Sequence, residues 1–365
     1  MAIDSGPGVA RDGLRVLVTG ATGNVGTSLL PKLVEDPDVS EVIGLARRPP
    51  AAASAEVTWR TADLAVDDLR GELRDVDVLV HLAWLLQPTR DIDRLWDVNV
   101  RATGRLLQAA AEAGVGAIVY ASSVGAYSPR PADGSQVDES WPTDGVPTSA
   151  YSMAKAYTER LLDVFEATHP DIRVVRLRPG LMFKAETASH VRREFLGTLF
   201  PRGLLHRGRL PVLPRLPGLE FQVLHADDAA DAFRRAVTGA HAGAFNLVAE
   251  PTLSLSDVAE LFEARTVAVP VGAVRPAVSL AWRARLIPID VGWFDLAVHS
   301  PTLSGLRART ELGWRPRHDA RASLAELLTA IRAGGGAPTP PLTPDTDHSR
   351  SAELTARQGA TEMPP

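Results

Sequence analysis

The chain contains no cysteine among its 365 residues. This absence excludes a disulfide-stabilised scaffold, a thiol nucleophile and a zinc site with cysteine ligands. No apolar stretch approaches the roughly 20 residues that a membrane-spanning helix needs. The first dozen residues also lack the basic segment and apolar core of a signal peptide. We therefore expect a cytoplasmic protein without a membrane partner.

Charge of one sign is not in large excess either. The 39 lysine and arginine residues face 44 aspartate and glutamate residues, and the formal net charge is −5. A nucleic-acid-binding surface carries an excess of positive charge, so we expect no nucleic-acid partner. The nine histidines show no metal-ligand spacing, and we expect no metal site. Hydrophobic residues make up 45% of the chain, which is enough to fill the core of one large or two smaller domains.

The stretch VLVTGATGNVG, residues 16–26, organises the rest of the chain. A short apolar run, three glycines spaced by two residues and a helical pattern predict a strand, a tight turn and a helix. Backbone N–H groups in such a turn face a pyrophosphate at the helix N-terminus. We expect cofactor contacts from Gly20, Thr22, Gly23, Asn24, Val25 and Gly26. The alternative is a glycine-rich loop that binds no ligand.

Apolar runs alternate with helical patterns along most of the chain. We expect strands at about 16–19, 41–46, 57–60, 76–83, 117–121, 172–178, 221–224 and 244–248. We expect helices at about 25–35, 91–113, 150–167, 226–237, 255–265 and 322–331. Strand–helix alternation predicts an α/β fold, a Rossmann-like doubly wound parallel sheet with right-handed crossovers.

The pattern also predicts how the chain is divided. The dinucleotide-binding domain should span 13–180, with 222–249 returning to it. A smaller, discontinuous C-terminal substrate lobe should comprise 181–221 and 250–332. Residues 1–12 and 333–365 are small, polar or rich in glycine and proline, and we expect both tails to be disordered.

The ends of the second and third strands bear on the choice of cofactor. Arg47 and Arg48 follow the second strand, where an acidic residue would bind the ribose of NAD. Arginine at this place meets the 2′-phosphate of NADP, so we prefer NADP to NAD; the alternative is a pair of solvated arginines. Asp63 follows the third strand and either accepts a hydrogen bond from the adenine or caps a helix that begins near Val66.

Two polar residues fall inside apolar patterns. His81 lies within the fourth strand, and we expect a core or cofactor-lining histidine rather than a catalytic one. Asn99 lies in the middle of a helical pattern, where we expect it to be buried with hydrogen-bond partners. Trp84 follows the fourth strand at its carboxyl end, where open α/β sheets bind their ligands.

A second motif carries the chemistry. Tyr151 and Lys155 are four residues apart on a predicted helix and therefore share one face. An ammonium group near a phenol stabilises the phenolate and lowers its pKa, so that the tyrosine can exchange a proton with a substrate oxygen. Ser123, at the end of the fifth strand, is placed to hold the same oxygen. The alternative for the pair is an amphipathic helix with a surface lysine.

The chain resembles the extended short-chain dehydrogenase/reductase family, in its epimerase/dehydratase-like branch. The matching motifs span about residues 14–331. They are TGATGNVG (19–26), Asp63-Leu64, His81-Leu82-Ala83, Asn99-Val100 with Thr103, Ala121-Ser122-Ser123 with Tyr127, Tyr151-Ser152-Met153-Ala154-Lys155, Arg178-Pro179-Gly180, His225-Ala226-Asp227-Asp228 and Leu312-Gly313-Trp314.

The resemblance implies a nicotinamide cofactor, with Asp63 near the adenine. It implies that Tyr151 is the catalytic acid/base, that Ser123 polarises the substrate and that Lys155 also holds the nicotinamide ribose. Members of the family often form dimers through helices that flank the sheet, so a homodimer is one state that the resemblance allows. The motif residues expected to line the cofactor in addition to these are Leu64, Leu82, Ala83, Asn99 and Pro179.

Two departures from the family pattern bear on the substrate. Leu181 stands where nucleotide-sugar members carry an asparagine, and Phe221 stands where they carry an arginine; both family residues contact a diphosphate. Their loss favours a less charged substrate. Arg192 and Arg193 could compensate; the alternative, which we prefer, is that these residues of a basic loop are solvated. The residues expected at the substrate are Trp84, Ser123, Leu181, Phe183 and Phe221.

Three functions follow from this pattern. The first is an NAD(P)-dependent oxidoreductase that transfers hydride between nicotinamide and a carbonyl or secondary alcohol of a small molecule. The second is a nucleotide-sugar epimerase or dehydratase that recycles its cofactor within the site. The third is a non-catalytic NADP-sensing regulator, a class that typically lacks the tyrosine and lysine pair that this chain keeps.

Overall fold

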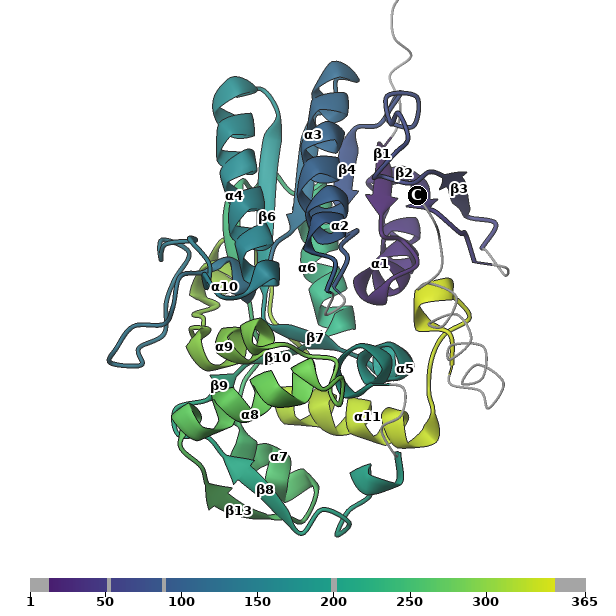
Figure 1. The fold of residues 1–365 in the computed structure, drawn as a ribbon. Helices are drawn as coiled ribbons and strands as arrows, with labels where there is room; N and C mark the ends of the chain where they lie inside the picture. The colour runs from purple at the N-terminus through teal and green to yellow at the C-terminus, as the bar shows by residue number, and fades with distance from the viewer. Residues whose placement is uncertain (1–12, 51–53, 87–89, 198–201, 345–365) are drawn as a thin grey trace, which may run out of the picture.

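The computed structural model describes residues 13–50, 54–86, 90–197 and 202–344, and its centre is one parallel sheet (Figure 1). The strand order is β11-β6-β5-β4-β1-β2-β3, and every neighbouring pair is parallel. This confirms the predicted Rossmann-like sheet. Its strands are β1 (Leu14–Thr19), β2 (Val39–Ala46), β3 (Val57–Thr61), β4 (Val78–His81), β5 (Ala117–Ala121), β6 (Arg173–Pro179) and β11 (Gly243–Leu247).

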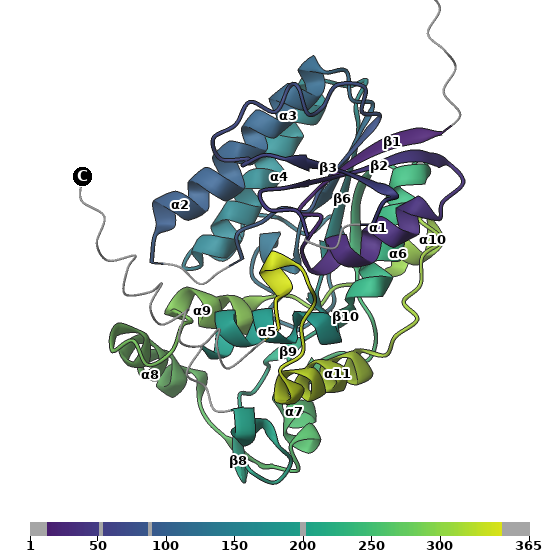
Figure 2. The same ribbon diagram turned by 90° about the vertical axis from the view of Figure 1, so that its right-hand side faces the viewer.

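Helices cover both faces of the sheet (Figure 2). Helices α1 (Asn24–Val34) and α6 (Ala226–Thr238) lie on one face, and α3 (Ala102–Glu112) and α4 (Ala150–Thr168) lie on the other. Side chains alternate along each strand, so Val16 and Val18 of β1 pack under α1, whereas Leu17 packs on the opposite side with α3. A sheet buried on both faces needs nearly continuous apolar strands, which explains the unbroken runs in the sequence.

The helix expected over 91–113 is interrupted. The structure has α2 (Ile92–Trp96), a wider π turn over Asp97–Arg101, and then α3. The π turn carries the buried Asn99, whose side chain accepts from the backbone N–H of Leu85 at 2.7 Å and donates to the Leu85 carbonyl at 3.0 Å. Such turns occur at functional sites because they redirect one side chain without ending the helix. Here the turn fixes the loop that follows β4.

The strand expected over 221–224 divides at Gln222. β9 (Glu220–Phe221) pairs antiparallel with β12 (Leu253–Ser254), and β10 (Val223–His225) pairs in parallel with β7 (Leu181–Phe183). The helix expected over 255–265 ends early as α7 (Leu255–Leu261), because Arg265 begins a strand that pairs with 212–215. The remaining elements are β8 (Val212–Arg215), β13 (Arg265–Ala268), α5 (Ala188–Val191), α8 (Val271–Arg283), α9 (Val291–His299), α10 (Leu306–Thr310) and α11 (Ala320–Ala333).

A buried ionic cluster joins α4 to β6. The fully buried carboxylate of Glu159 accepts from Arg176 and Arg178 at 2.9 Å each and from the hydroxyl of Ser122 at 2.6 Å. Burial opposes ionisation of Glu159, but the hydrogen bonds and charge of Arg178 prevail and lower its pKa to about 2. The cluster therefore holds an ionised carboxylate beneath the end of β5, next to Ser123.

Replacing Glu159 by glutamine should leave the buried guanidinium of Arg178 without its counter-charge, whereas Arg176 keeps Asp163 and Glu166 as partners. We expect E159Q to lose about 3–5 kcal/mol of unfolding free energy, because breaking a buried pair strands the other charge. Chemical denaturation monitored by circular dichroism measures this. As the control, D97N removes an exposed partner of Arg101 and should cost no more than about 1 kcal/mol.

The same variant should show a defined pH dependence. The pKa of Glu159 is lowered from 4.5 to about 2 on folding, so its stabilising effect is complete above the higher value and is lost as pH falls toward the lower one. The difference in stability between wild type and E159Q should therefore shrink as the pH is lowered through this window. A difference that stays constant would contradict the assignment of the charge to this residue.

Residues 334–344 form a C-terminal strap that the sequence did not predict. Figure 2 shows this segment rising from α11 toward α1. Leu342 is 1% exposed, and the hydroxyl of Thr339 donates to the Thr22 carbonyl in the glycine loop at 2.9 Å. Ser189 and Arg193 donate to further strap carbonyls. The boundary of disorder predicted at 333 is thus wrong for this segment, while 1–12 and 345–365 lie outside the described residues.

The strap should be held mainly by its one buried leucine. We expect L342A to weaken attachment by about 2 kcal/mol, or about 30-fold in the opening equilibrium, because a buried side chain is truncated. Hydrogen exchange at the amides of Gly335 and Ala337, which are bonded to Ala330 and Leu342, measures the opening. L306A, at a position that is 59% exposed, is the matched control. Unchanged protection of the strap in L342A would contradict its role.

Candidate active site

The glycine loop leaves no room for a side chain at Gly20 or Gly26. Gly20 has a φ of 67°, and a β-carbon there would lie 2.7 Å from the Ala83 backbone nitrogen. A β-carbon at Gly26 would collide with the Gly20 carbonyl. Helix α1 begins at Asn24 with no capping side chain and no acidic residue in its first turn. The loop therefore fits an anionic group at the positive end of the helix, as a dinucleotide pyrophosphate requires.

Residues beyond β6 reach this loop. Asn24 donates its side-chain amide to the Met182 carbonyl at 2.9 Å, and its buried side-chain oxygen has no partner among the described residues. The buried ammonium group of Lys184 donates to Thr27 at 2.7 Å and Ser28 at 2.9 Å. Burial lowers the pKa of Lys184. The side chain of Lys184 thus lies at the first turn of α1. The sequence did not predict this position, because Lys184 belongs to none of the motifs.

Arg47 and Arg48 are exposed at the end of β2. Arg47 lies 3.9 Å from the carboxylate of Asp63, and both side chains are largely open to solvent. Asp63 accepts from the backbone N–H of Ala65 at 2.9 Å and so caps a turn. No helix begins near Val66 in this described stretch, and that expectation is wrong. Binding of the adenosine by Arg47, Arg48 and Asp63 stays a prediction.

The catalytic candidates meet where β5 ends and α4 begins. Ser149 caps α4 by accepting from the Ser152 N–H at 3.3 Å, which places Tyr151 in the first turn. Tyr151 is hydrogen-bonded to Ser123, whose hydroxyl oxygen also accepts from the Gly125 N–H at 3.0 Å. A β-carbon at Gly125 would lie 2.7 Å from the Tyr151 ring. No local sequence signal marks Gly125, because the need for glycine arises only from this long-range contact.

The electrostatics of the pair differ from the expectation. Burial raises the pKa of Tyr151 to about 12, and the hydrogen bond to Ser123 opposes this only in part. The Lys155 ammonium donates to the Ala121 carbonyl at 2.7 Å and lies 3.5 Å from the centre of the Trp84 ring. Burial also lowers the pKa of Lys155. In this structure burial therefore raises the pKa of Tyr151, which is opposite to the expected direction.

His81 is a core histidine, as expected. Its ring nitrogens lie 2.7 Å from the hydroxyl of Thr19 and 2.9 Å from that of Thr103. Burial, and then the charge of Lys155, lower the pKa of His81 to about 3, so the ring is neutral. It joins β1 to α3 beside the glycine loop. Asn99 is fully buried, which agrees with the expectation, and it holds Leu85.

The structure brings Trp84, Ser123, Tyr151 and Lys155 together. The Trp84 ring stands edge-on to the Tyr151 ring, with centroids 6.1 Å apart. The other predicted residues lie on neighbouring segments, where their ligand contacts stay predictions. They are Leu64, Leu82 and Ala83 after β3 and β4, Pro179 at the end of β6, Leu181 and Phe183 on β7, and Phe221 on β9.

Arg192 and Arg193 bind the backbone. Arg193 donates to the carbonyls of Pro341 and Thr343 in the strap, at 3.0 Å each. Arg192 is 1% exposed and donates to the Gly197 carbonyl at 3.3 Å. Both guanidinium groups therefore serve to hold the strap and the turn after 196 in place.

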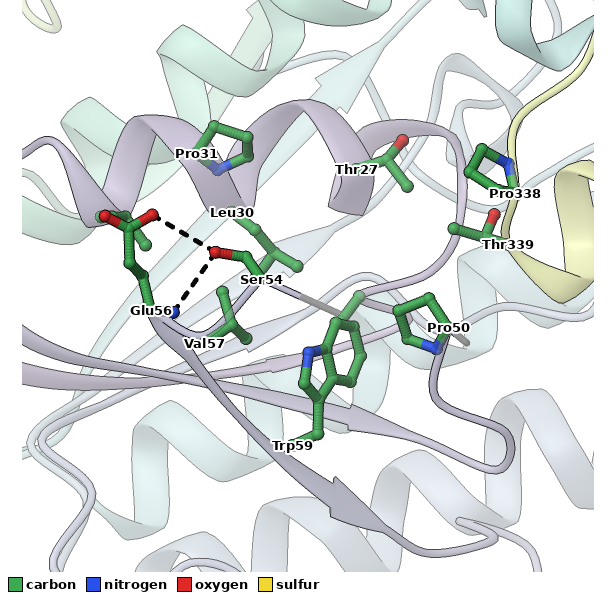
Figure 3. Close-up of a pocket in the computed structure, with 12 residues that line it drawn as sticks. Thr27, Leu30, Pro31, Pro50, Ser54, Glu56, Val57, Trp59, Pro338 and Thr339 are labelled. Atoms are coloured by element: carbon green, nitrogen blue, oxygen red, sulfur yellow. Dashed lines mark hydrogen bonds between the residues drawn. The ribbon is translucent and has the colours of Figure 1, made fainter. Parts of the chain in front are cut away.

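A separate pocket lies beside the glycine loop (Figure 3). It encloses about 210 Å³ between α1, the β3 region and the strap, and it contains neither Tyr151 nor Lys155. Trp59, Pro50 and Pro338 form its apolar walls. Among the residues described, no group of three or more acidic or histidine side chains is arranged to hold a metal ion. Nor is any described helix long and apolar enough to cross a membrane.

Parallel strands, a glycine cradle at a helix start and a Ser–Tyr–Lys group define the extended short-chain dehydrogenase/reductase class. Residues 16–247 match the NAD dependent epimerase/dehydratase family. The chain belongs to this family. The dTDP-glucose 4,6-dehydratase DesIV of Streptomyces venezuelae, solved with NAD bound, has a similar fold, with a TM-score of 0.66 and 22% identity over 88% of this chain and 97% of that one.

Curated relatives differ in what they do. An uncharacterised protein of Mycobacterium tuberculosis is 24% identical over 87% of this chain, which spans only 30% of that protein's length. The UDP-glucose 4-epimerase of Mycolicibacterium smegmatis is 29% identical over 87% of this chain and 99% of its own. A 4-hydroxy-2-methyl-3-oxo-4-farnesyl-3,4-dihydroquinoline-1-oxide ketoreductase of Stigmatella aurantiaca is 27% identical over 89% and 98%.

Proposed function

We propose that the chain is an NAD(P)-dependent oxidoreductase that reduces a carbonyl, or oxidises the matching secondary alcohol, on a small substrate without a diphosphate. The observation that carries the proposal is the group of Ser123, Tyr151 and Lys155, which lies at the same end of the parallel strands as the glycine loop. Burial raises the pKa of Tyr151 to about 12, and a phenol that keeps its proton can donate it, which supports the reductive direction.

The residues of this chain then have distinct roles. When bound in the cradle of Gly20, Gly23 and Gly26, the reduced cofactor supplies a hydride to the carbonyl carbon. Ser123 orients the carbonyl oxygen, and Tyr151 donates its proton to that oxygen as negative charge develops there. Hydride and proton together give the alcohol. The Lys155 ammonium stabilises the tyrosinate that remains until solvent returns the proton.

The sequence departures support an uncharged substrate. Leu181 and Phe221 replace two residues that would contact a diphosphate, and Arg192 and Arg193 are engaged with backbone carbonyls. The activity for which the S. aurantiaca relative is named, reduction of a ketone on a farnesylated ring, supports this proposal. The M. smegmatis relative favours a second candidate, a nucleotide-sugar epimerase or dehydratase.

Tyr151→Phe tests the first proposal. We expect the variant to lower kcat by about 10²–10⁴-fold, because it removes the proton donor, and to bind NADPH as tightly as wild type. Oxidation of NADPH across a panel of ketones and aldehydes measures turnover, and calorimetry measures binding. Y157F alters an exposed tyrosine on the same helix and is the control. Near-normal turnover by Y151F would rule out its catalytic role.

The panel also separates the alternatives. A nucleotide sugar converted without added NADPH would establish the epimerase or dehydratase instead. Tight NADPH binding with no turnover of any carbonyl or nucleotide sugar would establish the NADP-sensing regulator.

The arginines after β2 predict the cofactor preference. We expect NADP to bind more tightly than NAD, and we expect the double variant R47A/R48A to lose at least about tenfold in NADP affinity, because a charge-assisted contact to the 2′-phosphate is removed. NAD affinity should change little. R101A, an exposed arginine on the π turn, is the control. Tighter binding of NAD by the wild type would refute the interpretation of Arg47 and Arg48.

A further inference from the structure

An aromatic collar surrounds Tyr151. We define it as Trp84, Phe195 and Trp293, which come from the loop after β4, the turn after α5 and the start of α9. The Trp293 ring lies 4.9 Å from the Tyr151 ring at 30°, and Phe195 stands edge-on to Trp293 at 5.2 Å. Trp84 approaches Tyr151 edge-on from another element. Two rings from distant segments thus contact the ring of the proposed catalytic tyrosine, and Phe195 packs against one of them, Trp293.

These rings are placed differently from core aromatics. The collar rings and Tyr151 are half-buried, whereas Trp314 in the main core is 1% exposed. Each collar ring therefore keeps part of its surface open. A contiguous group of part-exposed aromatic rings beside a reactive group is suited to ligand contact, because contiguous apolar surface marks binding sites whereas single exposed apolar side chains do not.

Helix α9 is fixed to the start of α4 at the position of Trp293. A β-carbon at Gly292 would lie 3.0 Å from the Ser149 α-carbon, so only glycine allows this approach. Asp290 caps α9 by accepting from the Trp293 N–H at 3.0 Å. The buried carboxylate of Asp295 accepts from both guanidinium nitrogens of Arg275, at 2.9 and 3.0 Å. These anchors hold the Trp293 ring against the helix that carries Tyr151.

We propose that Trp293, supported by Phe195 and Trp84, determines substrate specificity by stacking on the ring of a flat, uncharged ketone whose carbonyl reaches Tyr151. Aromatic rings offer dispersion and π contacts but no charge, and a stacked pair contributes about 0.5–1.5 kcal/mol beyond the area it buries. A diphosphate needs charge-assisted donors, which the collar does not supply. This inference rests on the proposed oxidoreductase function.

Substitution of Trp293 tests the inference. We compare W293A and W293F on 1-acetonaphthone, a flat aromatic ketone, and on 2-octanone, a flexible aliphatic one. W293A should raise KM for 1-acetonaphthone by about tenfold or more while changing kcat for either ketone much less, and W293F should retain most of the wild-type KM. If Trp293 served folding alone, W293A would change kcat and KM by the same factors for both ketones. W141F, which alters a tryptophan outside the collar, is the control.

A binding measurement separates this inference from the proposed function. Calorimetric titration of 1-acetonaphthone into the complex with oxidised NADP, which has no hydride to give to a ketone, reports binding at the collar without any turnover. Binding that W293A weakens and W293F preserves supports the collar, even if no ketone is reduced and the oxidoreductase proposal fails. Equal KM effects on both ketones, or binding that W293A leaves unchanged, would overturn the collar while leaving carbonyl reduction intact. A clear wild-type preference for UDP-glucose over both ketones would also overturn it.

Discussion

The buried carboxylate of Glu159 is the group on which the placement of the proposed catalytic residues depends. It lies on α4, the helix of Tyr151 and Lys155, and it binds Ser122, the neighbour of Ser123. It also binds Arg176 and Arg178 of β6. One ionised side chain thereby joins the serine-bearing end of β5, the tyrosine-bearing helix and the adjacent strand. A hydrogen-bonded buried charge is costly to misplace, so it fixes these segments relative to one another.

The network continues outward from Arg178. Its guanidinium donates to the Tyr127 hydroxyl at 2.9 Å, and that hydroxyl donates to Asn246 of β11 at 2.7 Å. The strand that returns late in the chain is therefore joined to the same cluster as Ser122, the neighbour of Ser123. Arg178 and Tyr127 belong to motifs of the family resemblance. Their hydrogen bonds indicate that these motif residues hold α4, β6 and β11 together.

Burial also sets the protonation state of the site. The same apolar surroundings that raise the pKa of Tyr151 lower that of Lys155. The two shifts have one cause, since both charged forms lose contact with water. A lysine alone therefore does not make the tyrosine a base here. In the proposed reaction, a negative charge on Tyr151 is stabilised only when a reacting oxygen takes its proton and the Lys155 ammonium group is fully charged beside the tyrosinate.

Much of the fold and part of the site follow from local sequence. Apolar runs predict the strands, and the spacing of Gly20, Gly23 and Gly26 predicts the turn, because both depend on neighbours along the chain. Tyr151 and Lys155 share a helical face for the same reason. Gly125, Lys184 and Trp293 could not be predicted in this way, because each is explained by residues distant in sequence. The strap escaped prediction because its glycine- and proline-rich composition is typical of disorder, whereas one buried leucine anchors it.

The two halves of the site are coupled through the glycine loop. Asn24 and Thr27 of this loop and the first turn of α1 are bonded to Met182 and Lys184, which follow the substrate-side residue Leu181 directly. Thr22 is bonded to the strap, and the strap is bonded to Arg193, two residues before the collar ring of Phe195. Hydrogen bonds therefore connect the glycine loop with the strap, and the strap with Arg193. Movement of the strap relative to either segment would break these bonds.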